Sequence, residues 1–164
     1  MRSAGEGPDN GAMSQDQSRR DADAAMTSED RRAIVEAVES WTAAWENGDW
    51  RPATQHYAED ADWTNAFGVA CKSRGELDAT LAHIFSLTHV MAGRDEVGGH
   101  EIRSVRPDVV LVKTRIERSG QLTPSGQPLG TRHTTHLRVF ARREAGWKIV
   151  SHLISDARAS QRPH

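Results

Sequence analysis

The sequence has little of what marks several large classes of protein. Its single cysteine, Cys71, excludes an intrachain disulfide and a cysteine-based zinc site. Its 21 basic residues nearly balance 23 acidic ones, and the net charge of -2 argues against a nucleic-acid-binding face. No apolar run is long enough to span a bilayer, and the N-terminus lacks the apolar core of a secretory signal. We therefore expect a cytoplasmic protein with no nucleic-acid partner and no membrane partner.

The 164 residues are enough for one domain with a substantial core. Residues 1–26 are rich in Gly, Ser, Asp, Gln and Arg and have no aromatic or β-branched residue. Such a segment buries too little apolar area to offset its ordering entropy, so it is predicted to be a disordered leader. The folded domain is expected over residues 27–157, followed by a polar tail over residues 158–164.

Three helices are predicted in the first half of the chain. The first begins at Thr27 or Ser28, ends at Asn47-Gly48, and carries an apolar stripe with a period of 3.6 residues. The second is short, is capped by Asp49 and runs to about Tyr57. The third begins at the capping box of residues 73–76. The stripe of the first helix consists of Ile34, Val38, Trp41 and Trp45.

Between the second and third helices lies the stretch around which the chain is organised, residues 57–68. A strand is predicted over residues 60–67, with Ala61, Trp63 and Asn65 on one face, and residues 69–72 form a short return strand. We expect Asn65 at the floor of a pocket and Trp63 in its wall. In the third helix, His83 lies opposite the apolar stripe and is expected to be solvated or at an interface, and not catalytic.

From residue 100 onward the period changes from 3.6 to 2, which predicts strands over residues 101–106, 109–118, 131–142 and 147–155. Residues 119–130, with two Pro and three Gly, form a long hairpin loop and a candidate lid. Helices followed by long antiparallel strands predict an α+β fold, with three helices packed on a curved antiparallel sheet that encloses a pocket.

Alternation assigns the two faces of the later strands. In strand 109–118, the inward face carries Val110, Val112, Thr114 and Ile116. In strand 131–142 we place His133, Thr135, Leu137 and Val139 inward and His136, Arg138 and Phe140 outward. Both faces of strand 147–155 are apolar enough to be buried, so alternation does not decide whether His152 lines the pocket or packs in a dimer interface.

Asn65, His133 and His152 are the candidate catalytic residues. Asn65 can hold a carbonyl or enolate oxygen, and its alternative role is to bond nearby backbone at the end of its strand. An inward His133 is a natural general acid or base near neutral pH, and its alternative is a solvated position at the rim. If His152 lines the pocket, the three residues form an acid–base cluster.

The predicted substrate-binding residues are flat aromatic walls together with inward strand residues. For Trp41, ordinary core packing is the alternative role. No metal site is expected, because His133 and His136 are three apart on a strand and point to opposite faces. The substrate-binding set is Trp41, Tyr57, Trp63, Thr114, Ile116 and Thr135.

The order of several weak motifs resembles the NTF2-like superfamily, in its SnoaL-like branch and close to the SgcJ/EcaC type. These motifs are the helix end Trp-Thr-Ala-Ala-Trp-Glu-Asn-Gly-Asp49, then Tyr-Ala-Glu-Asp-Ala61, Thr-Asn-Ala-Phe-Gly68, Ser-Arg-Gly-Glu-Leu77 and Arg-Val-Phe-Ala-Arg-Arg-Glu-Ala-Gly-Trp-Lys-Ile149. The resemblance covers roughly residues 28–156. It implies a cone-shaped α+β fold, a deep apolar pocket between sheet and helices, and a homodimer through the outer sheet face.

The same superfamily includes ketosteroid isomerase, which uses an Asp base, a Tyr and a protonated carboxylic acid. The resemblance places these three positions at Asn65, Trp41 and Thr135, none of which matches. Leu81 stands where many SgcJ/EcaC-type relatives have a His. The isomerase mechanism is therefore not carried over to this chain.

The resulting expectation is a cofactor-free small enzyme that acts on a hydrophobic, polyketide- or isoprenoid-like molecule by proton transfer, as in isomerisation, cyclisation or dehydration in secondary metabolism. The alternative is a non-catalytic ligand-binding or oligomerisation module. Cross-strand pairs on the outer sheet face are expected at the dimer interface, with a solvated sheet face as their alternative role. These are Arg115, Glu117, His136 and Arg138.

Overall fold

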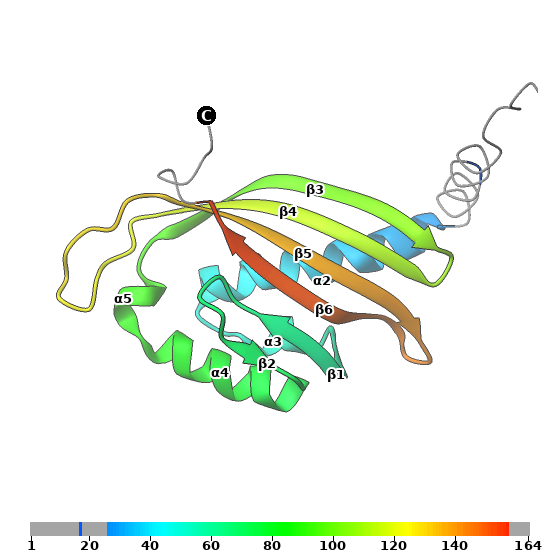
Figure 1. Ribbon diagram of the computed structural model, residues 1–164, viewed down its shortest axis with the longest axis horizontal. Coiled ribbons are helices and arrows are strands. Elements are labelled where there is room, and N and C mark those ends of the chain that lie inside the picture. Colours follow the sequence, from blue (N-terminus) through cyan, green and yellow to red (C-terminus); the bar gives the residue numbers. More distant parts are fainter. Residues whose placement is uncertain (1–16, 18–25, 158–164) are drawn as a thin grey trace, which may run out of the picture.

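The computed structural model describes residue 17 and residues 26–157, in which helices pack on a curved six-stranded sheet (Figure 1). Apart from Gln17 and Met26, the predicted leader and the tail 158–164 lie outside the described residues. No helix in the described part is long and apolar enough to cross a membrane. The elements are α2 (Ser28–Asn47), α3 (Arg51–Thr54), β1 (Tyr57–Thr64), β2 (Ala70–Cys71), α4 (Arg74–Ser86), α5 (Thr88–Met91), β3 (Arg94–Arg106), β4 (Val109–Ser119), β5 (Arg132–Arg143) and β6 (Gly146–Asp156).

The long helix α2 crosses the sheet and buries its apolar stripe against it (Figure 1). Its first turn is closed by a capping box, in which Thr27 accepts from the Asp30 N–H and Asp30 accepts from the Thr27 N–H. Asp30 also accepts hydrogen bonds from Trp147 Nε1 at 3.0 Å and from Arg142 at 2.7 Å. The N-terminus of α2 is thereby fixed to β5 and β6.

The sheet has the strand order β2-β1-β6-β5-β4-β3, and the predicted α+β architecture is confirmed. It is mixed rather than wholly antiparallel, because β1 runs parallel to β6. This pairing also explains why the second helix ends at Thr54 and not at Tyr57: Tyr57 already pairs with Ile149. Pairing with a distant strand overrides the local helical pattern here.

The strand β3 begins at Arg94, well before the predicted residue 101. Its pairing with β4 shifts between Val97 and His100, at the position of Gly98 and Gly99. An extra residue and two glycines break the alternation on which the prediction depended. Just before β3, the backbones of Gly93 and Gly120 approach so closely that a Cβ on Gly93 would lie 2.3 Å from the Ser119 carbonyl oxygen.

The faces of β5 are the reverse of those predicted. His136, Arg138 and Phe140 are buried, whereas Leu137 is 36% exposed and the His133 side chain is 55% exposed. The prediction used apolar character to choose the inner face. The outer face of this strand is the more apolar one, and the inner His136 and Arg138 form hydrogen bonds to each other and His136 to His152.

A β-bulge in β6 places two residues of different alternation phase on the same inner face. Val139 pairs with Ser151 and Phe140 pairs with Ile149, so Val150 has no opposite partner. As a result Ile149 and His152 both point inward and are each 1% exposed. His152 therefore takes neither of the two positions that the sequence offered: it points inward, away from the outer face, but lies in the hydrogen-bonded core and does not line the cavity.

Candidate functional site

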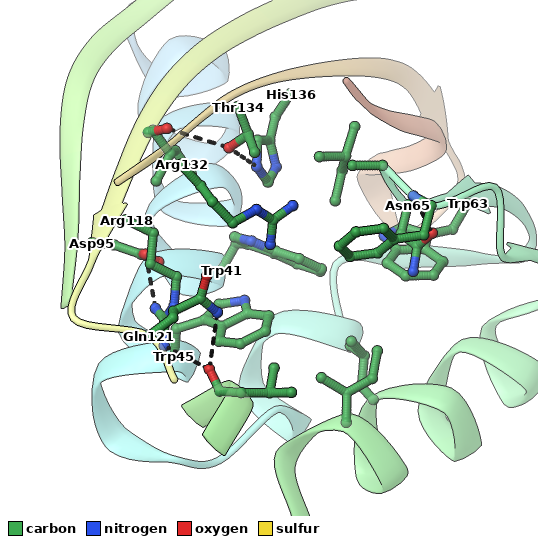
Figure 2. A pocket seen from close by; sticks show the side chains of 17 residues that line it. Trp41, Trp45, Trp63, Asn65, Asp95, Arg118, Gln121, Arg132, Thr134 and His136 are labelled. Carbon is green, nitrogen blue, oxygen red and sulfur yellow. Dashed lines mark hydrogen bonds and ion pairs between the residues drawn. The ribbon is translucent and has the colours of Figure 1, made fainter. Parts of the chain in front are cut away.

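A cavity of about 210 Å³ lies between the helices and the inner face of the sheet (Figure 2). Most of its wall is aromatic and aliphatic, and it is contributed by α2, α4, α5, the end of β1 with the loop after it, and the strands β3, β4, β5 and β6. The apolar wall consists of Trp41, Trp45, Trp63, Ala66, Phe67, Leu81, Ile84, Val90, Ile116 and Ile154. The volume and character of the cavity suit one small apolar molecule.

The polar part of the wall contains two arginines that are each paired with a carboxylate. Arg118 donates to Asp95 at 2.8 Å, and both side chains are at most 10% exposed. Arg132 donates to Asp156 at 2.9 Å, and its guanidinium also lies over the ring of Phe67. The polar lining residues are Asn65, Asp95, Arg118, Gln121, Arg132, Thr134 and His136.

A chain of hydrogen bonds runs from the cavity wall into the core. The Thr134 hydroxyl lies 3.2 Å from His136 Nε2, and His136 Nδ1 lies 3.0 Å from His152 Nε2. His152 Nδ1 lies 2.6 Å from the Tyr57 hydroxyl oxygen. The chain therefore has a pocket end, at Thr134 and His136, and a buried end, at Tyr57.

The partners of this chain fix its direction. The Thr134 hydroxyl donates to the Ile116 carbonyl at 3.3 Å, so it accepts from His136 Nε2–H. His136 Nδ1 is then an acceptor, and it accepts from His152 Nε2–H. His152 Nδ1 in turn accepts from the Tyr57 hydroxyl. In this arrangement both imidazoles are neutral and the pocket end presents an N–H donor.

Burial and charge keep the two histidines neutral. Desolvation lowers the pKa of His136 and of His152 well below the ordinary value of 6.5, and the positive charge of Arg138 lowers both further. Burial also raises the pKa of the Tyr57 hydroxyl, although the neighbouring Arg138 opposes that shift. At neutral pH the resting chain consists of a neutral phenol and two neutral imidazoles.

Arg138 lies beside this chain and is 1% exposed. Its guanidinium is 3.4 Å from His136 Nδ1 and 3.4 Å from the Thr114 hydroxyl, and it also hydrogen-bonds Tyr57. No carboxylate of the described residues forms an ion pair with it. A buried guanidinium with neutral partners alone is unusual, since buried charges are normally paired.

Asn65 lines the cavity but follows β1 rather than belonging to it. Its side-chain oxygen accepts from the backbone N–H groups of Phe67 and Val69, at 2.9 and 3.0 Å. This is the structural role considered as its alternative. The oxygen is used by the turn, so the amide N–H₂ is the part that can face a ligand.

The predicted orientation of His133 is wrong, because its side chain lies on the outer face and pairs with Glu117 at 3.3 Å. Thr135 is on that same face. Tyr57 and Thr114 point inward but lie behind the cavity wall, in the hydrogen-bonded core. Of the predicted binding residues, Trp41, Trp63 and Ile116 do line the cavity. His136 and Arg138, predicted on the outer face, lie inside.

His136, Arg132 and Gln121 are site residues that the sequence analysis missed. Gln121 belongs to the loop after β4, and its Nε2 donates to the Val90 carbonyl at 3.1 Å. The only available signal for His136 was its alternation with Arg138, which would have required the opposite choice of face. Among the described residues, no group of three or more His, Cys, Asp or Glu side chains could hold a metal ion.

The fold and the family follow from comparisons with known proteins. The structure is similar to a cystatin-like domain of unknown function from Nostoc punctiforme, with 24% identity over 81% of this chain and 80% of that chain, and a TM-score of 0.71. It is also similar to an NTF2-like protein from Novosphingobium aromaticivorans, with 18% identity over 81% and 85% and a TM-score of 0.63. A hexachlorocyclohexane dehydrochlorinase, LinA type 2, is 13% identical over 80% and 90%, with a TM-score of 0.66.

No curated protein matches the sequence. The model of the SnoaL-like domain matches residues 38–152, which run from within α2 to within β6 and include every lining residue of the cavity except Ile154. The match covers more than half of the chain, and the structural neighbours share the cone-shaped arrangement of helices on a curved sheet. The chain therefore belongs to the SnoaL-like domain family of the NTF2-like fold.

Proposed function

We propose that this chain is a cofactor-free enzyme that moves a proton on a small apolar molecule, in an isomerisation, cyclisation or dehydration. The observation that carries the proposal is the directed chain from Thr134 and His136 at the cavity wall to Tyr57 in the core. The similarity to a dehydrochlorinase of the same fold supports a reaction of this general kind. A polyketide- or isoprenoid-like ring system suits the aromatic walls.

In this proposal His136 acts where the sequence analysis placed His133. An oxygen of the bound molecule, such as a carbonyl that is becoming an enol, replaces the Thr134 hydroxyl as the acceptor of His136 Nε2–H. His136 Nδ1 recovers a proton from His152 Nε2, and His152 Nδ1 recovers one from Tyr57. The resulting phenolate is stabilised by the adjacent guanidinium of Arg138. Proton return along the same path restores the resting chain.

Asn65 and the tryptophans position the substrate in the same proposal. The amide N–H₂ of Asn65 supplies a second donor in the cavity wall, beside Trp63 (Figure 2). Trp41 and Trp63 pack against each other with ring centroids 6.5 Å apart, and together they form an aromatic wall against which a flat ring can lie; both are at most 3% exposed. Rigid buried walls limit the poses available to the ligand, which favours reaction over simple binding.

The first prediction concerns His136 and uses 2-tetralone, a flat bicyclic ketone, as the probe. The enzyme is expected to accelerate exchange of its α-hydrogens in D₂O, because the ketone oxygen accepts a proton while the α-proton leaves to water. His136→Gln keeps a hydrogen-bonding side chain but cannot relay a proton. It should lower the exchange rate by roughly a hundredfold, which is the lower end of the rate acceleration that a positioned general acid or base provides. Mass spectrometry of the ketone measures the rate.

The matched control is His133→Gln, which changes the exposed histidine three residues away on the same strand. It should leave the exchange rate unchanged, because His133 lies on the outer face. Equal losses in the two variants would contradict the assignment of His136.

A non-catalytic binding module is the second candidate function. It is favoured by one observation: the only carboxylate in the described cavity wall, Asp95, is already paired with Arg118 and so is a weak base. Binding of 2-tetralone with no exchange above the rate in buffer would support this second function.

A second prediction concerns assembly, for which we propose a homodimer through the outer sheet face. Leu137 and Leu153 are cross-strand partners on that face and are 36% and 50% exposed. Beside them Glu101 pairs with Lys113 and Arg115, so an apolar centre has a charged rim. Leu137→Asp should convert the dimer to a monomer in size-exclusion chromatography with light scattering.

Leu129→Asp is the control for assembly, because Leu129 is similarly exposed but belongs to the loop between β4 and β5. This variant should remain dimeric. A monomeric unmodified protein would refute the proposed interface.

A further inference from the structure

The buried charges around the cavity do not cancel. Arg118 is neutralised by Asp95 and Arg132 by Asp156, which leaves those two pairs without net charge. Arg138 has only neutral partners among the described residues. Its Nε–H is buried and has no hydrogen-bond partner. The region behind the cavity therefore carries one uncompensated positive charge in a water-excluded environment.

This charge reaches the cavity through His136. Arg138 Nη2 contacts the Nδ1 side of the imidazole at 3.4 Å, and the opposite side of the same ring carries the Nε2–H that lies at the wall. A cation at Nδ1 makes the Nε2–H a stronger hydrogen-bond donor. Two lining residues also keep N–H groups without partners among the described residues. The indole N–H of Trp63 is buried without one, and Arg132 uses only Nε and Nη2 on one oxygen of Asp156.

We infer that this cavity selects an apolar molecule that bears one negative charge, a carboxylate or a phenolate, with the anionic oxygen against His136 Nε2–H. Arg138 is the source of the selectivity, because the ligand supplies the counter-charge that the protein lacks. The inference rests on the cavity of the proposed function and narrows its substrate class. It requires binding only, and no chemical step.

The test compares two probes of nearly the same shape, 2-naphthoate and 2-naphthamide. Quenching of tryptophan fluorescence measures both dissociation constants at neutral pH, since three tryptophans line the cavity. The unmodified protein should bind naphthoate at least roughly tenfold more tightly than naphthamide, because a buried charge interacts strongly with an opposite one. Equal affinities, tighter binding of naphthamide, or no binding of either probe would overturn the inference.

Two variants identify the origin of the preference. Arg138→Met removes the charge at similar length and should bring the two affinities together, whereas Arg138→Lys should keep naphthoate preferred. Arg132→Met removes a positive charge at the cavity wall and should retain most of the preference. If Arg132→Met abolishes the preference and Arg138→Met retains it, Arg138 is not its source. Arg115→Met, on the exposed outer face, is the control for a general change in charge.

The test does not depend on whether a variant of Arg138 folds. The ratio of the naphthamide and naphthoate dissociation constants, measured on the unmodified protein, already decides whether the cavity prefers an anion. Failure here is distinguishable from failure of the proposed function. Exchange of 2-tetralone with equal affinities for the two naphthalenes would refute anion selection alone. A clear preference for naphthoate without any exchange would refute catalysis and leave anion selection standing.

Discussion

The free energy of unfolding is expected to fall steeply as the pH decreases below about 6.5. His136 and His152 are buried, and their pKa values in the folded protein are well below 6.5. In the unfolded chain both take up a proton near pH 6.5, whereas the folded chain stays unprotonated. The unfolded state therefore binds more protons, so stability that is present above pH 6.5 is lost as the pH falls.

Each fully buried histidine contributes up to about 1.4 kcal/mol per pH unit, and the pair up to about 2.7 kcal/mol per unit. His56 and His100 are also shifted downward, but they are partly exposed and add less. Urea unfolding followed by tryptophan fluorescence at a series of pH values measures the slope.

The variants for this measurement separate the buried pair from the rest of the chain. His152→Gln should reduce the slope of the free energy of unfolding against pH by about half, because only one of the two buried histidines is then left to take up a proton on unfolding. His83→Gln should leave the slope unchanged, since His83 is exposed on α4. A free energy of unfolding that is constant between pH 7 and pH 5.5 would refute the neutral, buried state of the pair.

The second large effect is expected from Asp30→Ala, which should lower the free energy of unfolding by about 3 kcal/mol. Asp30 is 8% exposed and accepts from the Thr27 N–H, from Trp147 Nε1 and from Arg142. These bonds hold its pKa far below the ordinary value of 3.8. The substitution removes half of the capping box and leaves the buried indole N–H without an acceptor.

Thermal and urea unfolding of two further variants give the control. Glu29→Ala removes an exposed carboxylate from the same first turn of α2 and should change stability by no more than about 0.5 kcal/mol. Trp147→Phe removes one of the hydrogen-bond donors to Asp30 and should lower the free energy of unfolding by less than Asp30→Ala does. If Glu29→Ala and Asp30→Ala are equally destabilising, the effect comes from the helix dipole and not from the bonds that join Asp30 to Trp147 and Arg142.

The fold could be predicted because its signals are local. The cap at Thr27, the apolar stripe with Trp41 and the glycine at position 48 bound α2 as expected. The capping serine at position 73 starts α4, and the alternation of β4 correctly gave an inward Ile116. Each of these patterns depends on contacts within a few residues, which a sequence displays directly.

The site was harder to predict because it breaks the rule that apolar residues face inward. On β5, His136 and Arg138 occupy the inner face and Leu137 the outer one. Hydrogen bonds between distant strands stabilise that inversion, and no local pattern encodes them. Asn65 is different, because its side chain bonds the turn that follows it, a local role that the sequence offered as an alternative. Only the three-dimensional pairing shows which polar groups meet.

The bulge at Val150 lets the family vary the length of β6 without changing what faces the cavity. Phe140 pairs with Ile149 and Val139 with Ser151, so loss of the single codon for Val150 would restore strict alternation and leave these pairs in register. Ile149 and His152 would both still point inward. The proton path therefore tolerates the gain or loss of one codon at this position, whereas a deletion elsewhere in the strand would turn every later side chain to the other face.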